Sequence, residues 1–110
     1  IAAGETTVTV KGKGRGGRCQ EFALAAALEL TSADRLTALA AGTDGSDGPT
    51  DAAGAIVDAD SVTRGTRAGG DAHRAMEDND AYRFLTASGD LIVSGATRTN
   101  LLDLYVVLRA

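Results

Sequence analysis

The chain has 110 residues, 44% of them hydrophobic and 24% charged, a composition that favours one folded globular domain and argues against disorder. Its formal net charge of −4 and isoelectric point near 4.8 argue against binding to nucleic acid or to an anionic membrane surface. No apolar run approaches the roughly 20 residues of a membrane span, and the single cysteine, Cys19, excludes an internal disulfide and suits the reducing cytoplasm.

The first part of the chain predicts a strand, a glycine-rich loop and a helix. ETTVTV (5–10) alternates and is rich in β-branched residues, which favours a strand. KGKGRGGR (11–18) combines four glycines with four basic residues, which is typical of a loop. CQEFALAAALEL (19–30) consists of good helix formers and is apolar on most sides, so we expect a buried helix.

A second strand leads into an aspartate-rich loop. LTALAA (36–41) is a short apolar run that predicts a buried strand. GTDGSDGPTDAAG (42–54) follows it and carries Asp44, Asp47 and Asp51 among glycines and threonines. Because ligands of open α/β sheets bind outside the carboxyl ends of strands, we interpret this stretch as a binding loop. A solvated turn is the alternative.

The rest of the chain continues the alternation of helices and strands. We expect a weak strand at 55–59, a helix from Asp60 or Ser61 to Gly69, a short helix at 72–78 capped by Asp71, a helix at 80–88, a strand at 91–95, a polar loop at 96–100 and a strand at 101–110. This order predicts an α/β fold, with a mixed sheet covered by helices in a single layered domain.

The glycine-rich loop has the pattern of a dinucleotide-binding fingerprint. Gly12, Gly14 and Gly17 give GxGxxG between a strand and a helix, but no acidic residue ends the next strand at the required distance. We therefore interpret the loop as an anion site, in which glycine amides, the helix N-terminus and Arg18 or Lys13 converge on a phosphate or carboxylate. A cationic surface turn is the alternative.

Cys19 and the pair Asn79–Asp80 have simpler interpretations than a role in catalysis. Cys19 follows Arg18 at a helix N-terminus, a setting that lowers the pKa of a thiol, but no His or Asn partner for nucleophilic catalysis stands nearby in the sequence. On local grounds, Asn79 and Asp80 between two helices are most simply helix caps.

Four segments together resemble the C-terminal domain of class II glycerate kinases, also called the MOFRL domain. They are GETTVTVKGKGRGGRCQEFALA, GTDGSDGPTDAAGAIVDAD, DNDAYRFL and SGATRTNLLDL, and the match runs from about Gly4 to the end. Members of that family have also been labelled hydroxypyruvate reductases. The resemblance implies an ATP-dependent kinase that makes 2-phosphoglycerate from D-glycerate with a divalent metal, Mg²⁺. It places the active site between this domain and a larger, Rossmann-like N-terminal domain.

The same resemblance implies roles for individual residues. It implies catalytic roles for Lys13, Arg18 and Asp44, and it implies that Asp44 and Asp47 bind the metal. Contacts to substrate or nucleotide are implied for Glu5, Gln20, Glu21, Thr43, Asp47, Thr50, Asp51, Asn79, Asp80, Thr97, Thr99 and Asn100. The sequence departs from the family pattern at Ala3 and Arg98, where glycine is usual, at Cys19, where asparagine is usual, and more mildly at Asp78.

These expectations define the ligands and partners. The ligands are a small hydroxy acid and a nucleotide, and the partner is the N-terminal kinase domain, with a homodimer left open. The start at Ile1, inside what resembles a strand, favours an excised piece, so we expect no kinase activity from this chain alone. The alternatives are a nicotinamide-dependent reductase and a non-catalytic binding module.

Overall fold

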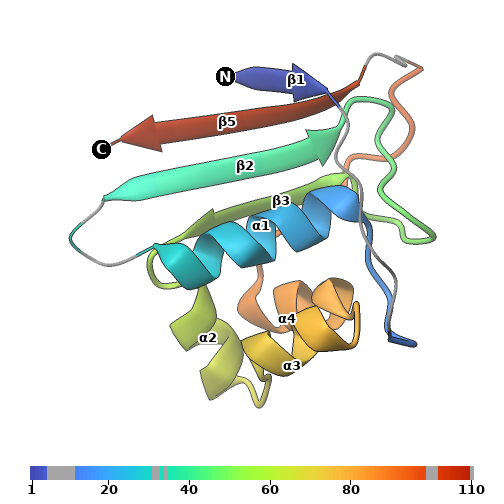
Figure 1. Ribbon diagram of the computed structural model, residues 1–110. Helices are drawn as coiled ribbons and strands as arrows, with labels where there is room; N and C mark the ends of the chain where they lie inside the picture. The colour runs from blue at the N-terminus through green and yellow to red at the C-terminus, as the bar shows by residue number, and fades with distance from the viewer. Residues whose placement is uncertain (5–11, 31–32, 34, 99–101, 110) are drawn as a thin grey trace.

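The strands form one antiparallel sheet. The computed structural model describes residues 1–4, 12–30, 33, 35–98 and 102–109. Within these ranges the sheet has the order β1-β5-β2-β3-β4 (Figure 1). Its strands are β1 (Ala2–Gly4), β2 (Leu36–Gly42), β3 (Gly54–Asp58), β4 (Leu91–Ile92) and β5 (Asp103–Arg109). At its centre, Leu39 of β2 lies opposite Ile56 on one side and Val106 on the other.

The predicted layering of helices on a sheet is confirmed. The sequence also predicts a mixed sheet, but every strand pair in the described ranges is antiparallel. The residues of a strand favour extended backbone without fixing the direction of its neighbour. Direction is decided here by connections: the loop after Gly42 turns the chain back into β3, and β5 returns beside β2.

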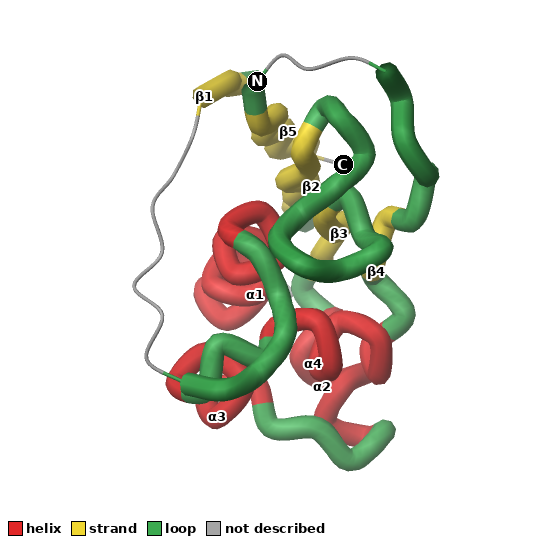
Figure 2. The backbone as a smooth tube through the Cα atoms, turned by 90° about the vertical axis from the view of Figure 1, so that its right-hand side faces the viewer, coloured by secondary structure: helices red, strands yellow, loops and turns green. Residues whose placement is uncertain are grey.

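The four helices of the described ranges lie on one side of the sheet (Figures 1 and 2). They are α1 (Arg18–Glu29), α2 (Ser61–Arg67), α3 (Ala72–Glu77) and α4 (Ala81–Ser88). α1 packs on β2 and β3, and the three short helices pack beneath it. Among the largest fully buried side chains are Leu24, Val57, Phe84 and Leu85. Burying each contributes about 1.5–3 kcal/mol to folding.

Small side chains let α1 approach the sheet closely. Ala23 and Ala27 on the helix and Ala38 and Ala40 on β2 are all buried and belong to one apolar core. The sequence predicts this arrangement, because a helix that is apolar on most sides needs burial. The position of α1 matters for the site, since its first residue lies at the end of the sheet where β2 stops (Figure 1).

Most of the predicted boundaries hold within a residue or two. The predicted helix stop at Gly89 is confirmed, with a left-handed φ of 82°. Asp71 caps α3 as predicted, because its side chain accepts from the backbone N–H of Arg74 at 3.1 Å. The predicted strand at 91–95 is shorter, since the chain leaves the sheet after Ile92. The predicted strand at 5–10 lies outside the described residues.

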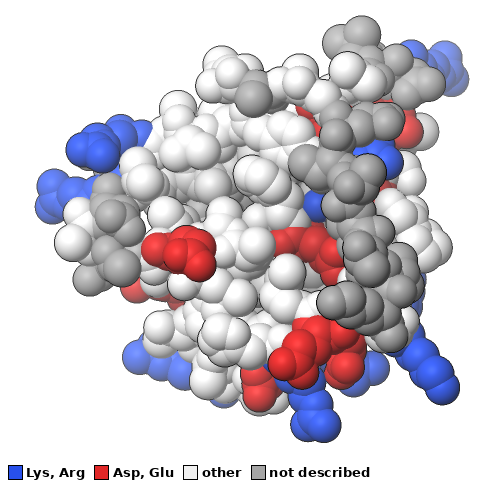
Figure 3. Space-filling view, in the orientation of Figure 1, with Lys and Arg blue, Asp and Glu red and all other residues white. Residues whose placement is uncertain are grey.

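Among the described residues, no concentrated basic patch is visible on the face drawn in Figure 3. There the Lys and Arg side chains project mainly from the periphery, while acidic side chains lie among uncharged ones (Figure 3). In the part of the chain that the structure describes, no helix combines the length and apolarity needed to cross a membrane.

Candidate functional site

Polar loops meet at the end of the sheet where β2 stops. The first residue of β5, Asp103, pairs there with the last residue of β2. Thr43 donates from its hydroxyl to the carbonyl of Leu102 at 2.8 Å, and Thr97 donates from its hydroxyl to the carbonyl of Thr43. Antiparallel pairing puts the end of one strand beside the start of the next. The two polar loops predicted from the sequence therefore come together.

Arg18 reaches this end of the sheet from the first turn of α1, where a buried carboxylate holds it. Its Nε and Nη2 donate to the two oxygens of Asp103, the second at 3.1 Å. The side chain of Asp103 is only 3% exposed, whereas that of Arg18 is 40% exposed. The hydroxyl of Tyr105 donates to the same carboxylate at 3.3 Å, and the Tyr105 ring packs on Phe22. A two-pronged ion pair of this kind fixes the plane of a guanidinium at the surface.

Asp44 lies exposed in the same group of loops. Its Oδ1 accepts from the backbone N–H of Ser46 at 2.9 Å, and its carbonyl accepts from the N–H of Thr97 at 3.3 Å. Among the described residues, no three His, Cys, Asp or Glu side chains come together as a metal site. Mg²⁺ often takes only one or two protein carboxylates and completes its shell with water and phosphate oxygens, so Asp44 fits as a single ligand. We call Arg18, Thr43, Asp44, Thr97 and Asp103 the strand-end cluster.

Asp47 has a different position, at the N-terminus of α1. Its Oδ1 accepts from the N–H of Cys19 at 3.0 Å and its Oδ2 from the N–H of Gln20 at 2.8 Å. Asp47 is only 4% exposed. A carboxylate at this place satisfies amides that the helix leaves unpaired and interacts favourably with the helix dipole. The geometry therefore favours a helix cap over the metal ligand implied for Asp47 by the sequence.

Gln20 and Thr50 brace that cap. The side-chain amide of Gln20 donates to the carbonyl of Asp47 at 3.2 Å and to the hydroxyl oxygen of Thr50 at 3.0 Å. The hydroxyl of Thr50 in turn donates to the carbonyl of Asp47 at 2.8 Å. Gln20 is fully buried. Both side chains thus hold the aspartate loop against α1.

The glycine-rich segment binds to another part of the same chain. The N–H of Gly12 donates to Oδ1 of Asn79 at 2.8 Å, and that of Gly14 to the carbonyl of Asp78 at 2.8 Å. The N–H of Arg15 donates to Oδ1 of Asp80 at 2.9 Å. A Cβ on Gly12 would lie 2.2 Å from the Asp78 backbone.

This arrangement corrects the predicted anion site. The sequence predicts that glycine amides and the helix N-terminus converge on a phosphate or carboxylate ligand. Instead, amides of Gly12 and Gly14 bind the segment between α3 and α4, and amides at the start of α1 bind Asp47. The glycines allow close approach of protein backbone, which the sequence pattern does not distinguish from close approach of a ligand.

Asn79 links the glycine-rich segment to α1. While its Oδ1 accepts from Gly12, its Nδ2 donates to Oε1 of Glu21 at 2.6 Å. Burial raises the pKa of Glu21, and the hydrogen bond from Asn79 opposes that shift. Asn79 adopts a φ of 54°, a left-handed conformation in which asparagine is enriched. Asn79 and Glu21 therefore act together as an internal clamp.

Cys19 is a buried neutral thiol. It is fully buried, and burial, together with the nearby charges of Asp47 and Asp103, raises its pKa well above the ordinary value. The sequence expects the opposite shift from the adjacent Arg18 and the helix N-terminus. That expectation is wrong because desolvation disfavours the thiolate, and Asp47 already occupies the helix end.

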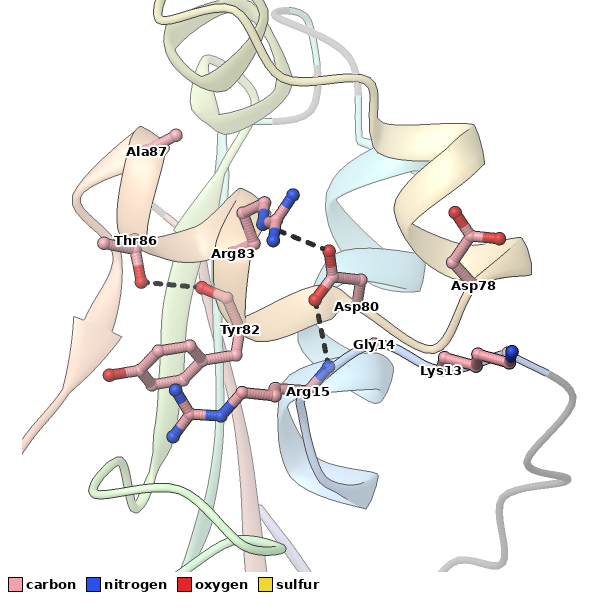
Figure 4. Close-up of a pocket in the computed structure, with 10 residues that line it drawn as sticks. Lys13, Gly14, Arg15, Asp78, Asp80, Tyr82, Arg83, Thr86 and Ala87 are labelled. Atoms are coloured by element: carbon pink, nitrogen blue, oxygen red, sulfur yellow. Dashed lines mark hydrogen bonds and ion pairs between the residues drawn. The ribbon is translucent and has the colours of Figure 1, made fainter.

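An open depression of about 820 Å³ lies beside the glycine-rich segment (Figure 4). The guanidinium of Arg15 lies 4.7 Å from the centre of the Tyr82 ring, and the Tyr82 hydroxyl donates to Asp51 at 2.8 Å. That hydrogen bond raises the pKa of Tyr82. Lys13 also lines the depression, with its side chain extended away from the Arg15–Tyr82 pair (Figure 4). Lys13 is therefore positioned by the segment packed on α4, whereas Arg18 and Asp44 lie at the strand ends.

A family model decides the classification of the chain. The model described as the MOFRL family matches residues 1–103. The chain belongs to the MOFRL family. The resemblance seen in the sequence motifs is thereby confirmed.

Curated relatives of this MOFRL chain carry two kinds of name. The D-glycerate 2-kinase of Thermotoga maritima is 47% identical over 98% of this chain and 26% of the relative. A protein of Agrobacterium vitis with the provisional name hydroxypyruvate reductase is 43% identical over 98% of this chain and 25% of the relative. The chain thus spans about a quarter of the length of the relatives it matches.

A solved structure confirms the fold. The crystal structure of glycerate kinase from Thermotoga maritima superimposes with a TM-score of 0.93 at 47% identity, covering 97% of this chain and 26% of that chain. The MOFRL fold described above is therefore also found as part of a larger kinase polypeptide.

The structure divides the predicted site residues of this MOFRL chain into four groups, one of which is Lys13 alone, beside the depression. Arg18, Thr43, Asp44 and Thr97 come together at the strand ends. Internal contacts engage Gln20, Glu21, Asp47, Thr50, Asp51, Asn79 and Asp80. Glu5, Thr99 and Asn100 lie outside the described residues.

Sequence reasoning missed Asp103 and Tyr105. Asp103 is a lone acid within LLDLYVVL, an otherwise apolar stretch that predicts a strand, and although it lies in the segment SGATRTNLLDL no site role is predicted for it. An acid at that place needs a cationic partner if the strand is buried, and this signal was available. The backbone at Arg98 explains why glycine is usual there in the family pattern. Its φ of 61° is in the left-handed region, which favours glycine.

Proposed function

We propose that this chain forms one wall of the active site of an ATP-dependent glycerate 2-kinase, which phosphorylates D-glycerate to 2-phosphoglycerate. The observation that carries the proposal is the strand-end cluster, where Asp103 holds the partly exposed side chain of Arg18 beside two threonine-bearing loops. The name of the Thermotoga maritima relative supports D-glycerate as the acceptor, and the charged and hydroxyl groups of the cluster are suited to binding such an acid.

Phosphoryl transfer needs positioning and neutralisation of charge more than covalent chemistry. In this proposal the guanidinium of Arg18 binds the carboxylate of D-glycerate or the oxygens of the transferred phosphoryl group. Thr43 and Thr97 shape the loops around it. Asp44 would hold the Mg²⁺ of a Mg²⁺–ATP complex, in which ATP would supply the phosphoryl group and the metal would neutralise its charge. We assign Lys13 to the nucleotide side, because it lies away from the cluster beside the depression.

The proposal needs a second wall. A kinase site must surround nucleotide, metal and acceptor and exclude water, and the cluster lies at one open end of this domain. We infer that a Rossmann-like N-terminal domain supplies the other wall, in keeping with relatives that are about four times as long as the matched segment. The predicted homodimer and cytoplasmic location stay predictions.

A reconstituted enzyme tests the proposal. In it, this chain replaces the matched segment of the Thermotoga maritima D-glycerate 2-kinase. We expect ATP-dependent phosphorylation of D-glycerate in a coupled assay with Mg²⁺, and none from the 110-residue chain alone. A folded reconstituted enzyme without turnover, or an isolated chain with robust turnover, would contradict the proposal.

A hydroxypyruvate reductase is the second candidate, and the name of the Agrobacterium vitis relative favours it. The glycine-rich segment argues against it, because Asp78, Asp80 and Asp47 of the chain itself occupy the space beside the three fingerprint glycines. Oxidation of NADH or NADPH with hydroxypyruvate would reverse this preference. If the folded reconstituted enzyme bound these ligands but catalysed neither reaction, the remaining alternative would be a non-catalytic binding module.

A further inference from the structure

The side of the sheet opposite the helices is largely apolar, with Thr37 and Asp58 as its polar residues at one end of β2 and β3, and no described helix covers it (Figure 2). Strand register places Ile56, Leu39 and Val106 in one row across the centre of this side. Side chains alternate along each strand, so Ala41, Leu104 and Leu108 point to the same side. We call Leu39, Ala41, Ile56, Leu104, Val106 and Leu108 the open face.

The exposure of the open face is unusual for an antiparallel sheet. Such a sheet normally alternates between an apolar side on the core and a polar side in water. Here Ile56 is 43% exposed and Leu108 is 63% exposed, and none of the six residues of the open face is fully buried. β5 reads LYVVL, apolar on both sides, which is typical of a strand covered on both faces. Contiguous apolar surface of this kind marks an interface.

We propose that amphipathic helices from the polypeptide that the relatives carry outside the matched segment cover the open face. The relatives have about three quarters of their length outside this fold, so they contain the material for a second layer. β1 is the edge strand beside β5, and Ala3 of β1 pairs with Leu104 of the open face. Helices on both sides would complete the layering common in α/β domains.

A matched pair of variants tests this proposal. The 110-residue chain is co-expressed with the Thermotoga maritima D-glycerate 2-kinase lacking its matched segment, and their association is measured by sedimentation without substrate or nucleotide. The open-face variant is Ile56→Thr with Val106→Thr. The control is Val93→Thr with Val107→Thr, since Val93 is 59% and Val107 is 55% exposed and neither belongs to the open face. Circular dichroism verifies that both variants are folded.

We expect association of the parent pair, weakened about tenfold or more by the open-face variant and less than about twofold by the control. Equal effects of the two variants, or no association, would overturn the proposal. So would a dimer of the chain alone that the open-face variant dissociates, because a second copy would then be the occupant. The assay does not involve phosphoryl transfer, so a complex without kinase activity would contradict the proposed function and leave this inference standing.

Discussion

At the level of single residues, Arg18 owes its position to Asp103, a residue to which the sequence resemblance assigns no role. Asp103 is buried and accepts from Arg18 and from Tyr105, so it depends on these donors for compensation of its charge. Removing one partner of such a pair is costly because the other charge remains buried. The effect of an Arg18 substitution on binding is therefore mixed with an effect on folding.

A double-mutant cycle separates the two effects. Arg18→Ala should lower the free energy of unfolding by about 2–3 kcal/mol, toward the low end for a broken ion pair because Arg18 is partly exposed. Arg18→Ala combined with Asp103→Ala should cost less than the sum of the two single changes. Urea denaturation of the four proteins measures this coupling. Additive costs would show that Asp103 does not depend on Arg18.

Asp47 and Asn79 show why the sequence predicted the site only in part. The motifs predict ligand contacts for Asp47 and Asn79, and the structure gives both residues contacts within the protein. A motif does not reveal whether a carboxylate or amide faces a ligand or the protein itself. Asp47 serves as a helix cap because the aspartate loop folds back onto α1, a long-range contact that local spacing does not encode.

At the level of elements, the glycine-rich segment is a packed strip of backbone. It lies against the connection between α3 and α4, with hydrogen bonds from Gly12, Gly14 and Arg15. The backbone of Asp78 lies so close to position 12 that only glycine fits there, since an added Cβ would lie 2.2 Å from backbone atoms of Asp78. At Gly16 the nearest atom would be 3.5 Å away, an ordinary contact.

These two glycines give a matched test. Gly12→Ala should destabilise the packed segment by about 1–3 kcal/mol and speed hydrogen exchange at the amides of Gly14 and Arg15. Gly16→Ala should change stability by less than about 1 kcal/mol, in either direction, because it adds no clash and restricts the unfolded chain. Amide exchange followed by NMR measures both. If the two variants behave alike, close packing does not explain the glycine at position 12.

The elements themselves were more predictable than their arrangement. Helix formers and caps place α1 and α3, and apolar runs place β2 and β5, because these signals are local. Strand direction and the helix-free side of the sheet depend on long-range pairing, and the expected mixed sheet did not anticipate either. β5 gave one usable signal, since LYVVL is apolar on both sides.

At the level of the whole molecule, two surfaces of this MOFRL fold point outward for different reasons. The strand-end cluster is polar and presents Arg18, whereas the open face is apolar. The first suits a small anionic ligand, and the second suits a layer of helices. The chain spans about a quarter of the length of its relatives, so the rest of such a polypeptide could contact both surfaces.

The most direct test of the central claim is the affinity of the reconstituted enzyme for D-glycerate, measured by titration calorimetry. The compensated variant, Arg18→Ala with Asp103→Ala, removes the guanidinium without leaving its buried partner charged. Arg15→Ala is the control, since it removes an arginine from the same glycine-rich region while leaving the cluster intact. We predict a loss of about tenfold or more, about 1.4 kcal/mol, for the compensated variant and less than about twofold for the control. Unchanged affinity in a folded compensated variant, or equal losses in both, would contradict the account.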